Sequence, residues 1–277
     1  MRMCALAICV ALLTCGLLTA HAQESLGEIT VTILYDNTAA VQGTTPSWGF
    51  SCFIQTASDT ILLDGGMVDT MLLQNASILG VDLSSTKRVF LSHDHRDHAG
   101  GLKGVLPLIS GVPVYVGSQF RLDVVHSLEL LGGRPEVVTG PVKISNGIFS
   151  TGELPSSIGT YEHGLVMDTD SGLVVVVGCS HPDIVEIVKR AKEAFGKKIF
   201  AVFGGFHLLE LTEPQTETIV QELRALGVRK CGPTHCTGEG PIKWIAEAFG
   251  ADYMPMGVGR VLRFSISGSG GQNMSPK

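Results

Sequence analysis

The sequence predicts an α/β protein in which a sandwich of β-sheets is covered by helices on its outer faces. Apolar segments of strand length come in close pairs early in the chain, and later strands alternate with helices of ten or more residues. Alternation of this kind builds parallel strands whose connecting helices cover the sheet. No repeat and no linker divides the chain after its first residues. We therefore expect one large domain over residues 23–267.

The strands are expected where short runs of β-branched and apolar residues lie between turn residues. In order along the chain, these runs are residues 28–35, 50–56, 60–63, 88–91, 112–116, 136–138, 164–168, 173–177, 198–203, 228–232 and 261–265.

Helices are expected at residues 68–79, 100–109, 118–131, 182–195, 213–226 and 241–249. Pro182 and Pro241 each stand in a first helical turn, where the missing amide hydrogen costs nothing. Ile184, Val188 and Ala191 recur on one face, as in a helix that lies on a sheet. The segments 36–48 and 145–161 are expected to be loops, and the tail 268–277 to be disordered.

Residues 1–22 have the pattern of a secretory signal peptide. Arg2 precedes an apolar run over residues 5–18, and Ala20-His21-Ala22 offers small residues around a cleavage point. A membrane anchor is the alternative, but the run is short for a bilayer. The sequence predicts an exported protein, periplasmic or secreted, whose mature chain begins near Gln23 and does not stay inserted in the membrane.

The charge of the chain bears on its partners. The net charge is −6 at pH 7, and no basic stripe is present. Nucleic acids and anionic membrane surfaces are therefore not expected as partners, because both attract clustered Lys and Arg. A small-molecule substrate is expected instead.

A dense group of potential metal ligands follows the apolar strand 88–91. Three histidines and an aspartate, His93, His95, Asp97 and His98, fall within six positions. His93 and His95 can address one cation, while Asp97 and His98 come a turn later and can address a second position. Imidazole nitrogen suits zinc, copper, iron and nickel, and a carboxylate adds an oxygen ligand.

Three further histidines also stand directly after apolar strands. They are His181 after 173–177, His207 after 198–203 and His235 after 228–232. Ligands of open α/β sheets bind outside the carboxyl ends of the strands. Histidines scattered through a core would not gather there, so the sequence indicates a metal site built from several strand ends.

These motifs resemble the metallo-β-lactamase superfamily. The resemblance rests on His-x-His-x-Asp-His at residues 93–98 with Leu-Asp-Gly-Gly at 63–66, and it extends over nearly the whole mature chain. Gly-Cys-Ser-His-Pro at 178–182, Gly-Gly-Phe-His-Leu at 204–208 and His-Cys-Thr-Gly at 235–238 resemble a narrower branch. That branch is named for 7,8-dihydropterin-6-methyl-4-(β-D-ribofuranosyl)aminobenzene-5′-phosphate synthase. The resemblance implies the αβ/βα sandwich fold and divalent metal.

The resemblance also implies roles for individual residues. The implied metal ligands are His93, His95, Asp97, His98, His181 and His235. Asp64 is expected to hydrogen-bond a ligand histidine and fix its tautomer. Many superfamily members have a metal-bridging aspartate where this sequence has Cys179, so Cys179 is expected beside the ligands as a small buried residue. His207 is expected as a ligand or as a donor to the substrate.

Other residues receive ordinary interpretations. Cys231 and Cys236 form either a disulfide or two buried thiols, and His126 and His163 are expected on the surface or in packing. Trp48 borders the loop over the site, where it either packs or grips a substrate.

The expected chemistry is hydrolysis. One or two Zn²⁺ ions, with Mn or Fe as alternatives, would lower the pKa of water to about 7 and polarise the bond under attack. The grouping expected is His93, His95 and His181 around one ion, with Asp97, His98 and His235 around the other, and with Asp97 and His207 serving catalysis. An ester, lactone, amide or phosphodiester is the expected substrate. The alternatives are a dihydropterin-type synthase, a transferase, and a redox or non-catalytic metal-binding protein.

Overall fold

The computed structural model describes residues 27–266 and 275–276. The segment 1–22, which the sequence assigns to a signal peptide, lies outside the described residues, as does most of the tail 268–277. In the described part of the chain, no helix has both the length and the apolar character needed to cross a bilayer.

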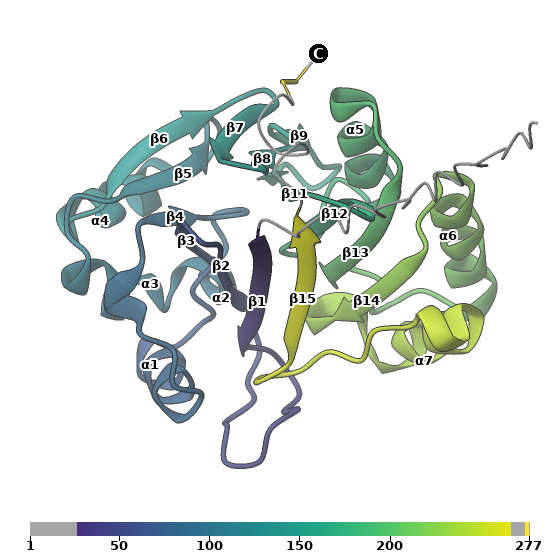
Figure 1. Cartoon of the computed structure of the whole chain (residues 1–277), viewed down its shortest axis with the longest axis horizontal. Helices are drawn as coiled ribbons and strands as arrows, with labels where there is room; N and C mark the ends of the chain where they lie inside the picture. The colour runs from purple at the N-terminus through teal and green to yellow at the C-terminus, as the bar shows by residue number, and fades with distance from the viewer. Residues whose placement is uncertain (1–26, 267–274, 277) are drawn as a thin grey trace, which may run out of the picture.

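Two β-sheets pack face to face at the centre of the molecule (Figure 1). In spatial order, the seven strands of the first sheet are β15 (Val261–Ile266), β1 (Gly27–Tyr35), β2 (Ser51–Gln55), β3 (Thr60–Leu63), β4 (Arg88–Phe90), β5 (Pro113–Gly117) and β6 (Arg134–Val138). The six strands of the second are β14 (Lys230–Thr234), β13 (Ile199–Gly205), β12 (Gly172–Val177), β11 (Leu165–Thr169), β8 (Ile148–Ser150) and β7 (Val142–Ser145). A separate pair joins β9 (Leu154–Pro155) and β10 (Tyr161–Glu162).

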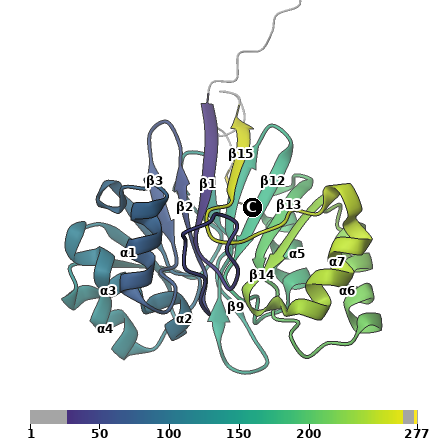
Figure 2. The same ribbon diagram turned by 90° about the horizontal axis from the view of Figure 1, so that it is seen from below.

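Helices cover both outer faces, so the layers run helix, sheet, sheet, helix (Figure 2). On the first sheet lie α1 (Asp69–Ile78), α2 (Arg96–Ala99), α3 (Leu102–Val105) and α4 (Leu122–Leu130), and on the second lie α5 (Ile184–Phe195), α6 (Glu213–Ala225) and α7 (Glu239–Phe249). Short 3₁₀ turns are η1 (Leu83–Ser85), η2 (Leu106–Leu108), η3 (His235–Thr237) and η4 (Gly250–Asp252). The predicted α/β sandwich is confirmed.

The core has three parts, as this layering requires. Between the sheets, Ile33 and Phe90 of the first meet Val176 and Phe203 of the second. Two further clusters lie under the outer helices, one on each side. Every residue of β12 is buried, because its sheet is covered on both faces.

The strand directions gather the loops that carry the histidines. Strands β3 to β6 run parallel to one another, and so do β12 to β14. The carboxyl ends of parallel strands meet at one edge of a sheet. The segments that follow β3, β4, β12, β13 and β14 therefore converge at one end of the sandwich.

The structure corrects two expectations. The helix expected at 100–109 is divided into α3 and η2, and a separate helix, α2, already begins at Arg96. The segment 145–161, expected to be a loop, contains β8 and β9, while β7 and β10 adjoin it. These strands have two to four residues, too few for an alternating pattern to show.

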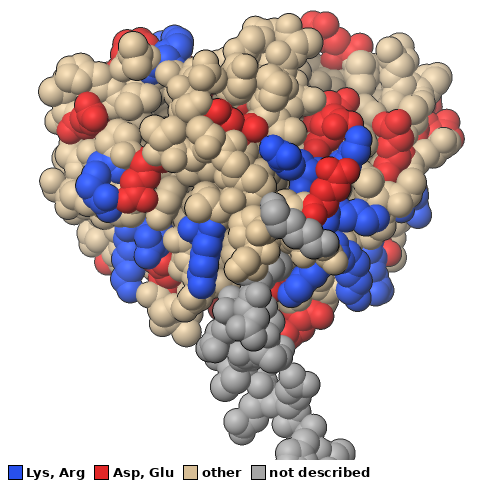
Figure 3. All heavy atoms as spheres, turned by 90° about the horizontal axis from the view of Figure 1, so that it is seen from above, with Lys and Arg blue, Asp and Glu red and all other residues tan. Residues whose placement is uncertain are grey.

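The four cysteines of the described chain, Cys52, Cys179, Cys231 and Cys236, are all free and buried. Of the two alternatives for Cys231 and Cys236, the structure therefore has buried thiols rather than a disulfide. On the face in Figure 3, basic and acidic side chains lie interspersed rather than in a stripe of one sign.

Candidate metal centre

Two groups of potential ligands lie at the carboxyl ends of the strands. The donor atoms of His93, His95 and His181 all lie within 4.8 Å of one another. We call these three residues the first cluster. Asp97, His98, Cys179 and His235 form the second cluster by the same distance. The structure thus brings together the six residues that the sequence singles out as ligands, and it adds the Cys179 sulfur.

The first cluster is made of imidazoles. The His93 ring lies 4.7 Å from the rings of both His95 and His181, measured between centroids. His93 follows β4, and His95 caps α2 in an extended conformation with ψ 150°. His181 comes from the other half of the molecule, after β12. The halves of the sandwich therefore share this cluster.

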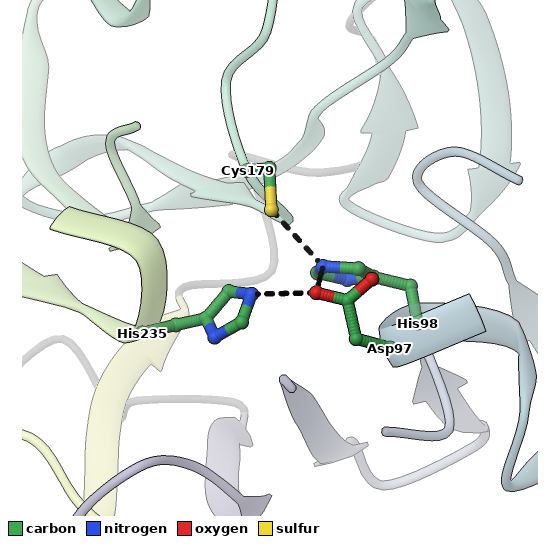
Figure 4. Close-up of side chains that lie close together, drawn as sticks. All are labelled: Asp97, His98, Cys179 and His235. Atoms are coloured by element: carbon green, nitrogen blue, oxygen red, sulfur yellow. Dashed lines mark hydrogen bonds and ion pairs between the residues drawn. The ribbon is translucent and has the colours of Figure 1, made fainter. Parts of the chain in front are cut away.

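The second cluster surrounds the Asp97 carboxylate (Figure 4). Asp97 Oδ2 lies 3.3 Å from His235 Nε2 and 3.7 Å from His98 Nε2. Cys179 Sγ lies 3.1 Å from His98 Nε2. Nitrogen, oxygen and sulfur donors thus point at a common position, which is the mixed set that zinc accepts.

Two imidazole nitrogens have no partner for hydrogen bonding in the described structure. They are Nε2 of His93 and Nε2 of His235, one in each cluster, and both atoms are buried. His235 Nε2 has only the ion-pair contact with Asp97 Oδ2, which does not have the geometry of a hydrogen bond. Buried polar atoms are almost always satisfied. A cation at each cluster would supply the missing partner, so the residues present fit a divalent transition-metal ion.

Asp64 sets the protonation of two ligand rings. Its Oδ1 accepts from the Ser92 amide at 2.7 Å, while its Oδ2 accepts from Ser92 Oγ at 2.8 Å and from His98 Nδ1 at 2.7 Å. Because the Ser92 hydroxyl hydrogen goes to Asp64, Ser92 Oγ can only accept from His93 Nδ1, 2.9 Å away. Nε2 of His93 and Nε2 of His98 are therefore the ring atoms that face the clusters, which is the orientation a metal ligand needs.

Glu162 does the same for His181. Its carboxylate is fully buried and accepts from the amides of Cys179, Ser180 and His181. Its Oε2 also accepts from His181 Nδ1 at 2.9 Å, leaving Nε2 for the first cluster. Glu162 stands in a two-residue strand, next to the more conspicuous His163. No motif marks it in the sequence.

Asn37 and Trp48 support the second cluster from the loop between β1 and β2. Asn37 Oδ1 lies 3.1 Å from His235 Nδ1, and Asn37 Nδ2 donates to the His235 carbonyl at 3.1 Å. Trp48 Nε1 donates to Asp97 Oδ2 at 2.8 Å, and its ring lies 4.8 Å from that of His235. Trp48 is 42% exposed and is therefore not packed in the core, while its use as a substrate contact stays a prediction.

Burial and charge keep the rings and carboxylates in complementary states. Burial lowers the pKa of His93 well below its usual value, and the neighbouring His98 adds to this effect. Burial alone would lower the pKa of His98, but Asp64 and Asp97 raise it to about 9. Burial would raise the pKa of Glu162, yet His93 and His181 hold it well below its ordinary value. Glu162 is thus a carboxylate at neutral pH.

His207 stands at the outer side of the first cluster. Its ring lies 4.5 Å from that of His181, and its donor nitrogen is grouped within 4.8 Å of Cys179 and Cys236. It belongs to neither main cluster. It is the most exposed of the six clustered histidines, a position from which it can meet a substrate.

The backbone at this end of the sandwich is unusual. Five described residues other than glycine have positive φ angles, between 50° and 98°, and all follow strands or loops at the clusters: Asp64, Ser180, Asp183, His207 and His235. Side chains with a Cβ rarely adopt this conformation. Here the turn aims each ligand or supporting group toward the strand ends.

The remaining histidines and charged residues near the motif have structural contacts. His163 Nε2 donates to Leu91 O at 2.8 Å, its Nδ1 lies 3.0 Å from Ser150 Oγ, and its ring stacks on that of Phe90 at 4.2 Å. His126 is exposed on α4 beside Glu129. Asp94 pairs with Arg121, away from both clusters.

A family model decides the classification. The model described as the metallo-beta-lactamase superfamily matches residues 46–185, which include the 93–98 motif and Cys179. The chain belongs to the metallo-β-lactamase superfamily. The match ends before His207 and His235, which the fold nevertheless brings to the same end of this metallo-β-lactamase sandwich.

Individual relatives support the same conclusion. The chain is 29% identical over 269 residues to the 7,8-dihydropterin-6-methyl-4-(β-D-ribofuranosyl)-aminobenzene-5′-phosphate synthase of Methanocaldococcus jannaschii, covering 79% of this chain and 92% of that protein. It is also 29% identical to the crystal structure of Tm1679, described as a metal-dependent hydrolase of the beta-lactamase superfamily, with TM-score 0.70 and coverage of 86% and 99%. The metallo-beta-lactamase fold protein YhfI of Bacillus subtilis shares the fold at 14% identity, with TM-score 0.61 and coverage of 84% and 99%.

Proposed function

We propose that this protein is a metal-dependent hydrolase that holds two divalent ions, one at each cluster. The observation that carries the proposal is the pair of buried, unpartnered nitrogens, His93 Nε2 and His235 Nε2, each directed at a group of further donors. The similarity to Tm1679, described as a metal-dependent hydrolase, supports the reaction class.

Zinc fits both clusters better than the alternatives. Three imidazoles, as in the first cluster, leave a fourth tetrahedral position open, which is typical of catalytic zinc. A thiolate beside two imidazoles and a carboxylate, as in the second cluster, also favours zinc over Mg²⁺ or Mn²⁺. Iron is the second choice for these donors.

The residues of the chain then have distinct tasks. A bound divalent ion supplies an acidified water and polarises the carbonyl or phosphoryl oxygen of the substrate. Asp64, Glu162 and Asn37 hold the ligand rings in the tautomers and directions just described. Asp97 can accept a proton at Oδ2, where Trp48 Nε1 fixes the carboxylate. We assign His207 the role of donating a hydrogen bond to an anionic substrate group.

A second candidate is a synthase reaction. It is favoured by the 29% identity to the dihydropterin-type synthase, whose sequence this chain covers almost completely. The same two clusters would serve a condensation as well as a hydrolysis, because in both reactions an ion polarises a leaving group. Fold alone does not choose between them.

The experiment has two steps. Elemental analysis of protein purified without added metal is expected to give about two zinc ions per chain, counting the two clusters. Ester, lactone, amide and phosphodiester reporters are then assayed with and without a chelator. A condensation assay runs alongside them, with an aminobenzene ribofuranosyl phosphate and a dihydropterin whose methyl carbon carries a diphosphate, which leaves as the new bond forms. Turnover of a reporter that stops on chelation supports the hydrolase. Condensation without hydrolysis would replace it, and iron with a visible spectrum and no turnover would favour redox chemistry.

A further inference from the structure

A cavity of about 630 Å³ opens beside the second cluster, within the size range of small-ligand sites. His235 forms its inner wall, and Trp48 separates it from Asp97. The cavity therefore adjoins the second cluster through His235, while the other residues of the two clusters are not part of its lining.

The walls of this cavity are mainly apolar. They are formed by Trp48, Leu209, Ile242, Tyr253 and Met256, from the loop after β1, the loop before α6, α7 and the segment before β15. Trp48 is 42% exposed and Leu209 is 59% exposed, and both lie in the wall of this one cavity. An apolar group of a ligand that binds between them would bury this exposed apolar surface.

The charges around the cavity exclude one kind of ligand. Among the described residues that line it there is no Lys or Arg, and Glu239 contributes a carboxylate. A negatively charged group would find no Lys or Arg partner in this lining and would be repelled by Glu239. The cavity thus suits a neutral group.

The opposite side of the site differs. A second cavity of about 470 Å³ is lined by His95, Asp97, Arg96, Arg121 and other polar residues. Trp48 lies in the wall of the first cavity, while its partner Asp97 lies in the wall of the second. The indole–carboxylate hydrogen bond therefore separates an apolar compartment from a polar one.

We propose that the cavity lined by Trp48, Leu209 and Ile242 binds an uncharged ring of the substrate, aromatic or heterocyclic, while the reacting group lies over the clusters. This inference rests on the proposed metal-dependent function and narrows its substrate class. Trp48 acts in two ways. It forms a flat wall for the ring, and it is a positioning residue for the Asp97 carboxylate.

A matched series of hydroxamic acids tests the proposal, because the hydroxamate chelates the ion and only the attached group varies. The zinc-loaded full chain carries Trp244→Phe, which leaves Trp48 as the single tryptophan and the reporter of occupancy. Benzohydroxamic and 2-naphthohydroxamic acids are expected to quench Trp48 fluorescence and to bind at least about tenfold more tightly than acetohydroxamic acid, because a ring is buried. 4-Carboxybenzohydroxamic acid is expected to lose most of this increase in affinity, because its ring carries a negative charge.

Variants locate the ring. Ile242 is a half-exposed residue of α7, and Ile242→Asp places a negative charge in the cavity. The substitution should remove the extra affinity of the two neutral ring compounds and leave the affinity of acetohydroxamic acid unchanged. Leu209→Asp, on the exposed rim, should act in the same way if Ile242→Asp does not fold. Lys243→Asp, the neighbouring exposed position outside the cavity, is the control.

The outcomes separate the two proposals. Equal affinity for all four hydroxamates would overturn the ring site and leave the metal centre standing. No binding by acetohydroxamic acid would overturn the metal centre. In that case 2-naphthol, which does not chelate a metal, tests the ring site by itself. It is expected to quench Trp48 fluorescence in the Trp244→Phe protein but not after Ile242→Asp is added. Absence of quenching in the Trp244→Phe protein would overturn the ring site as well.

Discussion

Glu162 holds His181 by two hydrogen bonds to a single oxygen: the backbone amide and the Nδ1 of His181 both lie 2.9 Å from Glu162 Oε2. The other oxygen accepts from the amides of Cys179 and Ser180. One buried carboxylate therefore fixes the whole turn that follows β12. It acts on both clusters, because Cys179 belongs to the second and His181 to the first.

Glu162→Gln should weaken both clusters without changing side-chain volume. The Gln side chain has only one accepting oxygen, so a backbone donor is left unpaired. The free energy of unfolding should therefore fall by about 2 kcal/mol. Metal affinity should fall about 10- to 100-fold, as for other residues that orient ligands. Zinc titration against a chelating indicator measures this. Glu186→Gln, exposed on α5, should leave affinity unchanged, and an unchanged affinity in Glu162→Gln would contradict the assigned role.

His95→Ala should remove the ion of the first cluster and the reporter activity together. Only His93 and His181 would remain there, and two imidazoles hold zinc poorly. Elemental analysis should show about one ion fewer per chain. His126→Ala, an exposed histidine on α4, is the matched control. A His95→Ala protein with its full metal content would exclude His95 as a ligand.

Cys179→Ser should alter the second cluster selectively. Sulfur is a softer ligand than a hydroxyl, so the variant should bind cadmium much more weakly while its preference for manganese rises. In cobalt-substituted protein the near-ultraviolet thiolate charge-transfer absorption should disappear. Cys52→Ala removes a buried thiol between the sheets and should retain the absorption. If the absorption persists in Cys179→Ser, the sulfur ligand lies elsewhere.

Removal of metal should lower the thermal stability of the whole domain. Each cluster joins donors from both halves, so a bound ion favours only the folded state. At a free zinc concentration of about 100 times Kd, the stabilisation is about 2.7 kcal/mol per ion. For a domain of this size that corresponds to a fall in Tm of about 5–10 °C for each ion that chelation removes. Differential scanning calorimetry measures it, and an unchanged Tm after verified metal loss would count against ions that bridge the halves.

Asp59 should make stability depend on pH far from the clusters. Burial raises its pKa, but hydrogen bonds from Arg88 and Ser145 outweigh this and lower it below the ordinary value. The ionised form is therefore stabilising above the unfolded pKa of about 3.9, and the stabilisation is lost as pH falls through the folded value. In metal-free protein, Asp59→Asn should cost about 1 kcal/mol at pH 7 and progressively less below pH ~4.

Urea unfolding at pH 3 and at pH 7 measures how much Asp59→Asn lowers the free energy of unfolding. Asp123→Asn, on the exposed side of α4, serves as the control for loss of one charge. A cost that is equally large at pH 3 and pH 7 would show that Asp59 does not act through its ionisation.

The sequence predicted the long strands well because each is an apolar run bounded by turn residues. The residues after those runs are the clustered histidines, and parallel pairing of β3 to β6 and of β12 to β14 brings them to one end. The two groups of histidines therefore followed from strand order and spacing. Their ligand roles remain predictions until an ion is measured.

Features without a local pattern could not be predicted. Glu162 is defined by amides 17 to 19 residues further along the chain, which only the fold places around it. Position 101 is glycine because it packs on Gly65, where a Cβ would lie 1.9 Å from the Gly65 carbonyl oxygen. Trp48 reaches Asp97 from a loop that has no regular structure. These contacts depend on tertiary packing, not on periodicity.

The left-handed turns at Asp64, Ser180, Asp183, His207 and His235 imply a trade-off between durability and chemistry. Each holds a non-glycine residue at a cost of about 1 kcal/mol, because a Cβ is crowded in that conformation. Glycine at His207 or His235 would relax the backbone while deleting the imidazole. At His207 and His235, thermal stability and the chemistry of the site therefore place opposite demands on the same residue.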